Sequence, residues 1–142
     1  MREILFRGKR TDNGKWIEGS YVKMPTEEIC IMTDKIETKF VFGILPETVG
    51  QFTGLIDRNG TKIFEGDVVH LIGGEFYQGY HEIDENIVVK DITDCVYFGE
   101  VELLEVIGNI HDNPELMEEL VKKETEKAIN YWNEKRGNNE ID

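Results

Sequence analysis

Residues 51–74, QFTGLIDRNGTKIFEGDVVHLIGG, contain a dense pattern of turn residues between apolar runs. Asn59-Gly60 lies between two strand-like runs, and this dipeptide is the strongest short-range signal for a β-hairpin. The second turn, Glu65–Asp67, places glycine between two acids, where a carboxylate can accept a bond from nearby backbone while glycine takes positive φ. The stretch therefore predicts tightly turned strands. The predicted turn positions are Gly54, Asp57, Asn59, Gly60, Glu65, Gly66 and Asp67.

The spacing in this stretch does not fit the common ligand loops. An EF-hand calcium loop starting at Asp57 needs Gly at its sixth position and Glu at its twelfth, where the chain has Lys62 and Val68. Neither glycine pattern of phosphate-binding loops occurs in the chain. Glu65 and Asp67 are candidates for an acid–base pair or for metal ligands, because alternate residues of a strand share one face. We favour the turn interpretation, and predict no catalytic, cofactor-binding or metal-binding residues.

Strand signals continue on both sides of this stretch. Asn13-Gly14 predicts an N-terminal hairpin, and residues 28–33 and 38–44 are rich in the β-branched and aromatic residues typical of strands. Residues 100–110 predict a further strand whose apolar positions change phase, so we expect a β-bulge near Leu103-Leu104.

The C-terminal part changes to a helical period. Asp112 or Asn113 is a candidate N-cap, and Pro114 suits the first helical turn. Apolar residues then recur at spacings of three and four and predict one apolar stripe on a helix. The stripe consists of Leu116, Leu120, Val121, Ala128, Ile129 and Trp132.

These elements predict a mostly β fold, all-β or α+β, with one C-terminal α-helix. Short strands at this spacing favour a small barrel or folded-over sheets, with an SH3-like barrel element that begins near Gly66. We expect an N-terminal β subdomain at 1–65 and an SH3-like β-barrel subdomain at 66–112 with a variable excursion at 73–99. The helix is expected at 113–136 and a polar tail at 137–142.

Composition indicates a soluble globular protein of 142 residues, with 39% hydrophobic and 32% charged residues. No apolar run approaches the roughly 18 residues that cross a bilayer, and the first residues lack the pattern of a signal peptide. We therefore expect no membrane association and a cytoplasmic location. Cys30 and Cys95 lie in apolar runs and are predicted to be unpaired, buried thiols.

Charge is distributed unevenly along a chain whose net charge is −13. Residues 1–23 hold six Lys and Arg against three acids, whereas residues 75–105 hold nine acids against Lys90 alone. Because affinity for nucleic acid depends on neutralising phosphates, this balance disfavours direct nucleic-acid binding. A basic edge facing the acidic part of a second copy instead suits a homo-oligomer.

Exposed aromatic residues are the candidate contacts for a protein partner. Phe76, Tyr77 and Tyr80 lie in the acidic segment, and Trp132 lies on the predicted helix. A stacking platform for bases is the alternative, but no Lys or Arg is interleaved with the three aromatic residues.

Three segments together resemble a known family. They are MREILFRGKR at residues 1–10, PETVGQFTGLIDRNGTKIFEGDVV at residues 46–69 and VIGNIHDNPEL at residues 106–116. This combination resembles the YopX family of phage and prophage proteins, over residues 1 to about 120. The resemblance implies a small, mostly β protein of bacteriophages and of prophages in low-GC Gram-positive bacteria. It supplies no catalytic residues, so residues 54–67 carry over as structural positions only.

The sequence thus leads to an expected function and two alternatives. We expect a non-enzymatic module that binds a phage or host protein or assembles with itself, without a cofactor. The first alternative is a nucleic-acid-related role, through the basic hairpin or as an acidic mimic that occupies a host DNA-binding protein. The second is a metal-dependent hydrolase that uses Glu65, Asp67 and the acidic neighbourhood of His81.

Overall fold

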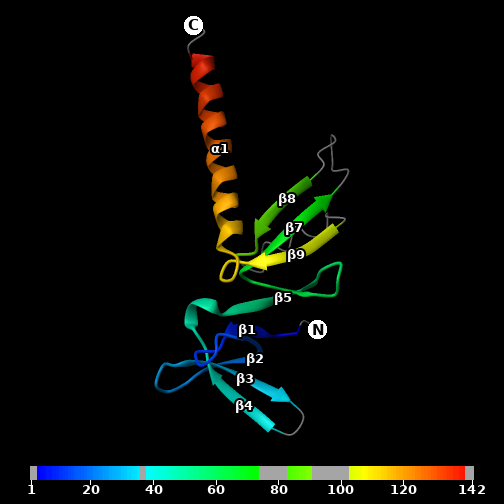
Figure 1. Cartoon of the computed structure of the whole chain (residues 1–142), viewed down its shortest axis with the longest axis vertical. Coiled ribbons are helices and arrows are strands. Elements are labelled where there is room, and N and C mark those ends of the chain that lie inside the picture. Colours follow the sequence, from blue (N-terminus) through cyan, green and yellow to red (C-terminus); the bar gives the residue numbers. More distant parts are fainter. Residues whose placement is uncertain (1–2, 36–37, 74–82, 91–102, 140–142) are drawn as a thin grey trace.

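The computed structural model of the chain describes residues 3–35, 38–73, 83–90 and 103–139 (Figure 1). The predicted partner contacts Phe76, Tyr77 and Tyr80 lie outside the described residues, as do His81 and Cys95.

Strands dominate the described chain, and one long helix follows them. The strands of the first half are β1 (Phe6–Lys9), β2 (Trp16–Lys23), β3 (Ile29–Lys35) and β4 (Thr38–Gly43), followed by the short 3₁₀ helix η1 (Pro46–Thr48). The second half contains β5 (Gly50–Ile56), β6 (Lys62–Phe64), β7 (Asp67–Gly73), β8 (Ile83–Val88), β9 (Leu103–Asn109) and α1 (Pro114–Asn139).

The strands form two antiparallel sheets. The first sheet has the order β4-β3-β2-β1-β5-β6, and the second has the order β8-β7-β9. Within the described residues neither sheet closes into a barrel, so the predicted small barrel does not form there. The predicted mostly β fold with one C-terminal helix is confirmed.

The N-terminal hairpin forms at Asn13-Gly14. Gly14 adopts a φ of 70°, and the Asn13 side chain accepts a hydrogen bond of 2.9 Å from the backbone N–H of Lys15. The left-handed region is open to glycine without a Cβ penalty, which explains why this dipeptide turns the chain here. Lys9 and Trp16 therefore face each other as the last pair of β1 and β2.

The main core lies between the β5–β6 hairpin and the second sheet. Ile63 of β6 packs with Val69 and Leu71 of β7 and with Val89, and all four are buried. Partly buried residues of both layers complete this cluster: Leu55, Ile87, Leu104 and Val106. The β5–β6 hairpin thus belongs to the first sheet by pairing and to the second sheet by packing.

Strand β9 contains a bulge, although not at the predicted position. Val68 pairs with Gly108 and Val69 pairs with Val106, so Ile107 is the additional residue. The prediction of a bulge near Leu103-Leu104 was therefore wrong in position. Leu104 and Val106 both pack against the core, and the phase changes only after them.

The beginning of α1 is attached to the end of β9. Asn113 Oδ1 accepts a hydrogen bond of 3.0 Å from the backbone N–H of Asn109. A Cβ at Gly108 would lie 2.5 Å from the same oxygen, so glycine permits this close approach. This attachment sets the direction in which α1 leaves the sheet.

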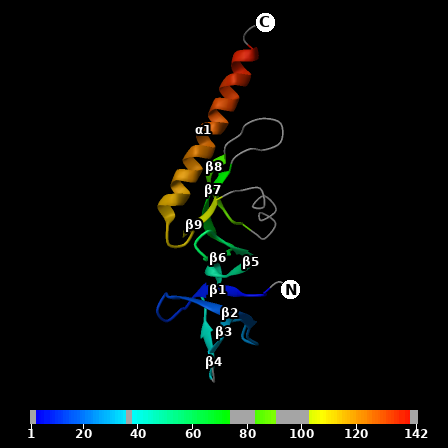
Figure 2. The ribbon, with the colours of Figure 1, turned by 90° about the vertical axis from the view of Figure 1, so that its right-hand side faces the viewer.

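Helix α1 rises beside the second sheet and continues beyond it (Figures 1 and 2). It begins at Pro114, as predicted, and runs to Asn139, so Gly137 does not end it. Among the described helices, none combines the length and apolar character that crossing a membrane requires.

Candidate functional site

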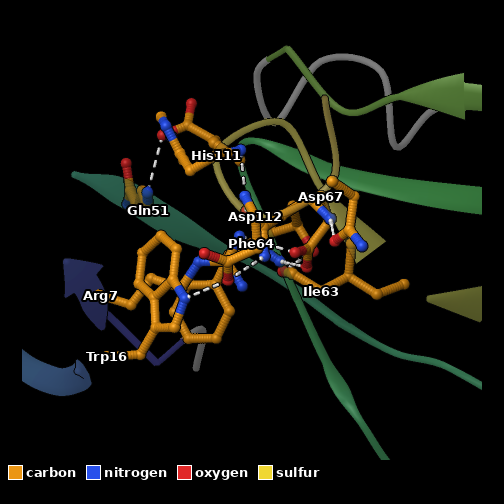
Figure 3. Close-up of polar contacts among 12 residues, drawn as sticks. Arg7, Trp16, Gln51, Ile63, Phe64, Asp67, His111 and Asp112 are labelled. Atoms are coloured by element: carbon orange, nitrogen blue, oxygen red, sulfur yellow. Dashed lines mark hydrogen bonds and ion pairs between the residues drawn. The ribbon is translucent and has the colours of Figure 1, made fainter. Parts of the chain in front are cut away.

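A buried ion pair joins the two sheets at the point where β1 and β7 approach each other (Figure 3). Arg7 Nη2 of β1 lies 2.6 Å from Asp67 Oδ1, and the two side chains are 14% and 1% exposed. The guanidinium carbon also lies 4.7 Å from the centre of the Trp16 ring and 4.9 Å from that of Phe64. Two aromatic faces and one carboxylate thus compensate for the removal of the Arg7 charge from water.

The carboxylate of Asp67 also fixes the turn that precedes β7. Asp67 Oδ2 accepts a hydrogen bond of 2.8 Å from the backbone N–H of Phe64, and Gly66 between them adopts a φ of 93°. Burial raises the pKa of Asp67 above its usual value, although Arg7 and the Phe64 N–H oppose that shift. Both oxygens of Asp67 therefore act within the fold.

Asp112 forms a second connection between the N-terminal hairpin and the segment that leads into α1. Trp16 Nε1 donates a hydrogen bond of 2.7 Å to Asp112 Oδ2, and Lys9 forms an ion pair with Oδ1 (Figure 3 shows the Trp16 bond). The hydrogen bond from Lys9, followed by that from Trp16, lowers the pKa of Asp112 to about 2. Asp112 is therefore held as an anion beside the first hairpin.

His111, next to Asp112, lies against the same tryptophan. The rings of Trp16 and His111 are 5.8 Å apart. Burial, and then the positive charges of Arg7 and Lys9, lower the pKa of His111 below its usual value. The imidazole is thus favoured in its neutral form and packs as part of the joint between the sheets.

Asp57 organises the β5–β6 turn and attaches it to β9. Its Oδ1 accepts hydrogen bonds from the backbone N–H groups of Asn59 and Thr61, at 2.8 and 2.9 Å. Its Oδ2 accepts one of 2.9 Å from the N–H of Val106. Burial raises the pKa of Asp57, but these three hydrogen bonds outweigh it and hold the pKa below its usual value.

Of the remaining predicted turn residues, Asn59, Gly60 and Glu65 lie in these two turns. Gly54 was wrongly predicted as a turn position, because it lies inside β5, between Phe52 and Ile56, where the pairing with β6 is irregular. Gly54 and Gly60 adopt φ values of 90° and 81°, and Asn59 Nδ2 donates to Glu105 Oε1 at 3.2 Å. Glu65 Oε1 accepts a hydrogen bond of 2.8 Å from the backbone N–H of Gln51. Glu65 and Asp67 are thus engaged in separate contacts with the fold. Across the described ranges, no three His, Cys, Asp or Glu side chains group as metal ligands would.

The basic N-terminal hairpin is partly neutralised by acids of the same chain. Arg10 donates to both oxygens of Asp12, at 2.9 and 2.5 Å, and its guanidinium carbon lies 4.0 Å from the centre of the Phe42 ring. The ion pairs of this hairpin are Arg7–Asp67, Lys9–Asp112 and Arg10–Asp12. These three cations therefore have carboxylate partners, which reduces their availability to phosphates.

A groove of about 720 Å³ separates the first half of α1 from β8 and the residues that follow it. Its lining residues on α1 are Met117, Leu120, Val121, Glu124, Thr125 and Ala128. On the opposite side it is lined by Asn86, Ile87, Val88 and Lys90. Six of these ten lining residues are apolar, and Lys90 and Glu124 are charged.

In the groove and beyond it, α1 carries large apolar side chains that the rest of the described chain leaves exposed. Val121 and Trp132 are 60% and 65% exposed, and Ile129 and Tyr131 are also more than half exposed. Most helical stability in proteins comes from packing an apolar face rather than from propensity, so the exposed apolar residues of α1 are suited to contact with a partner. We take this face and the adjoining groove as the candidate functional site.

Comparison with known proteins places the chain in a family. The sequence profile described as YopX protein matches residues 5–118, which include both sheets, the joint between them and the beginning of α1. This chain belongs to the YopX family. A comparison with curated proteins found no match for the YopX chain. Among solved structures it is similar to protein EF1440 from Enterococcus faecalis, with 22% identity, a TM-score of 0.41, and coverage of 82% of this chain and 99% of that chain.

Most of the exposed apolar face lies beyond the part of the YopX chain that matches the family profile. The match ends at residue 118, whereas Val121, Ile129 and Trp132 follow it. The candidate site thus combines a groove whose β8 side belongs to the family region with a helix face that extends past it.

Sequence reasoning missed the joint of this YopX chain. Trp16 and Asp112, which share a hydrogen bond, are 96 positions apart. No local pattern marks either residue as a partner of the other, since their contact depends on how the two sheets pack. Trp132 was predicted as a partner contact from its place on the helix, and the structure leaves it exposed.

Proposed function

We propose that this YopX-family chain is a non-enzymatic module that binds a protein, either a different one or a second copy of itself, through the apolar face of α1. The occupant of the face is an α-helix of that protein, laid against α1 in the groove beside β8. The exposure of Val121 and Trp132 on one side of a long helix is the observation that carries this proposal. Recognition of a helix in a groove uses apolar anchors at such spacings.

The contacts of the acidic residues support a binding role rather than a catalytic one. Asp57, Asp67 and Asp112 each accept hydrogen bonds from the fold, and Asp67 also pairs with Arg7. A catalytic carboxylate needs a free oxygen facing a substrate pocket. We therefore assign these three carboxylates to the stability of the joint and the turns.

Electrostatics favours a protein over a nucleic acid as the partner. Arg7, Lys9 and Arg10 have carboxylate partners, and the chain has a net charge of −13. Binding to a phosphate backbone would have to overcome both effects. Contact between an apolar helix face and another protein does not require cations that are free to bind phosphate.

The proposal is tested by placing a charge on the proposed face and a matched charge on the opposite face. Trp132→Glu puts a carboxylate on the proposed apolar face. Asn130→Glu adds the same charge about 160° around the helix, because each residue advances roughly 100°. Asn130 is exposed, so this control leaves the proposed face intact.

Two readouts decide the outcome: the oligomeric state of each purified variant, and the proteins that each retains from an extract of the encoding organism. We expect the wild type and Asn130→Glu to behave alike, and Trp132→Glu to lose the association. If all three proteins retain the same partners and have the same oligomeric state, the proposed binding face is wrong.

A further inference from the structure

The helix that fills the groove comes, we infer, from a second copy of this chain. The two α1 helices lie antiparallel, and Trp132 of each copy enters the groove between α1 and β8 of the other. This inference rests on the proposed function, because it names the occupant of the same face. It is carried by the order of residues along α1.

Residues at alternating spacings of three and four along α1 form a stripe that complements itself when reversed. Such spacing is that of the core positions of a two-helix coiled coil. In order, the stripe consists of Glu118, Val121, Thr125, Ala128, Trp132 and Lys135. The stripe begins with an acid and ends with a base. A large apolar residue lies next to each charged end, and two small residues lie at the centre.

Antiparallel pairing matches each member of this stripe with a suitable partner. Glu118 of one helix faces Lys135 of the second copy, Val121 faces Trp132, and Thr125 faces Ala128. The small central pair allows the helix axes to approach closely, because interaxial distance depends on the side chains at the contact. The charged pairs lie at both ends of the contact, where they set its direction.

Parallel pairing of the same stripe would be unfavourable. Glu118 would face Glu118, and Lys135 would face Lys135, so like charges would meet at both ends. The two Trp132 side chains would also meet each other, and the two Val121 side chains would face each other without a large residue to fill the space between them. Charge complementarity therefore selects the antiparallel arrangement.

The groove receives Trp132 of the second copy at the level required by this register. Val121, which faces that Trp132, lines the groove together with Ile87 on the β8 side. The groove of about 720 Å³ is large enough for an indole ring and its neighbours on the arriving helix. The ring would contact α1 on one side and the second sheet on the other.

The overall shape of the chain permits this contact. The second sheet lies beside the first half of α1, strands β1–β4 lie beyond its N-terminal end, and its C-terminal half extends away from both (Figures 1 and 2). A helix of 26 residues is about 39 Å long, so an antiparallel pair places the two sets of sheets toward opposite ends. Because screening acts over about 8 Å at physiological salt, two chains of −13 each repel little at that separation. The contact is isologous and closes as a dimer.

Light scattering coupled to chromatography tests whether a second copy of the chain binds in the groove. We expect a dimer for the wild type and for Asn130→Glu, and a monomer for Trp132→Glu. A wild type that is monomeric at about 100 µM overturns this inference. The proposed function is then decided separately, by whether Trp132→Glu loses the proteins that the wild type captures.

Charge reversal tests the direction of the pair. Glu118→Lys and Lys135→Glu should each weaken dimerisation about tenfold at low salt, because each places like charges together at two symmetric positions. The double variant Glu118→Lys with Lys135→Glu should recover most of the wild-type affinity. A double variant no better than either single variant contradicts the antiparallel register.

Cysteine cross-linking gives an independent readout of direction. In a Cys95→Ser background, with native Cys30 buried, a mixture of Glu118→Cys and Lys135→Cys should form a mixed disulfide under mild oxidation. Lys135→Cys alone should not cross-link with itself, because its two copies would lie about 25 Å apart along the helices. Self-cross-linking of Lys135→Cys without the mixed product would indicate parallel helices. That result would overturn this inference and leave the proposed binding face standing.

Discussion

Arg7 Nη2 lies 2.6 Å from Asp67 Oδ1 and thereby links the first strand of the chain to the first strand of the second sheet. Asp67 follows the turn glycine Gly66, and Arg7 lies between the rings of Trp16 and Phe64. The stretch at residues 51–74 thus supplies one member of an ion pair that connects the two sheets. Asp67 stabilises the fold through its contact with Arg7, which lies outside that stretch.

Breaking this ion pair from one side should destabilise the fold strongly. Asp67→Asn keeps an acceptor for the Phe64 N–H but leaves the Arg7 guanidinium without its counter-charge. Removal of one member of a buried pair costs about 3–5 kcal/mol. Urea unfolding should therefore show a clear loss for Asp67→Asn, and a smaller additional loss when Arg7→Met is combined with it. Strictly additive losses would show that the two side chains do not interact.

The exposed pair Arg10–Asp12 provides a matched comparison. Asp12 is largely solvent-exposed, and ion pairs in that setting contribute little to stability. Asp12→Asn should therefore leave the free energy of unfolding almost unchanged. A loss comparable with that of Asp67→Asn would mean that the hairpin depends on its surface charge.

Asp112 should make stability depend on acid pH. Its pKa in the folded chain is about 2, below the usual 3.8, because Lys9 and Trp16 bind the carboxylate. The carboxylate therefore contributes stability that is fully present above about pH 4 and is lost as the pH falls toward 2. Asp112→Asn should lower the melting temperature at pH 5, and the difference from wild type should shrink by pH 2. A difference that stays constant over this range would contradict the assigned contacts.

Asp57 should be among the most sensitive polar positions. Asp57→Ala leaves the N–H groups of Asn59, Thr61 and Val106 without their acceptor, and each unsatisfied buried donor costs about 1–3 kcal/mol. We expect a total loss of about 2–4 kcal/mol, because water can reach part of the turn. Amide exchange at Val106 should accelerate in the same variant. Unchanged exchange there would show that Asp57 does not hold the turn against β9.

Replacing Gly60 should reduce the free energy of unfolding by an amount that depends only on the backbone preference of the new residue. It has a φ of 81°, and a Cβ placed on it would meet nothing within 4 Å. Gly60→Val should therefore cost about 1 kcal/mol or more, whereas Gly60→Asn should cost less, because asparagine tolerates the left-handed region. Thermal unfolding of both variants distinguishes them. Equal losses would point to a contact of the new side chain instead of backbone strain.

Local patterns predicted the elements of this fold better than their contacts. Asn13-Gly14 and Pro114 mark a turn and a helix start because the backbone preferences of these residues act within a few positions. The bulge at Ile107 was misplaced because its position depends on which side chains of β9 reach the core. The contact between Arg7 and Asp67 had no local signal at all, since it arises only when the two sheets pack. The choice of Trp132 as a partner contact rests on helical spacing and stays a prediction, and the structure leaves its side chain exposed.

The β5–β6 hairpin pairs with the first sheet and packs against the second, and this arrangement affects how the chain unfolds. Its strands complete the hydrogen bonding of the first sheet, while Ile63 is buried against Val69 and Leu71 of the second. Neither sheet can therefore lose its structure while the other keeps a complete core. Heat or denaturant should melt both sheets in a single cooperative transition, and a chain cut at the 65–66 boundary should yield two fragments that do not fold independently.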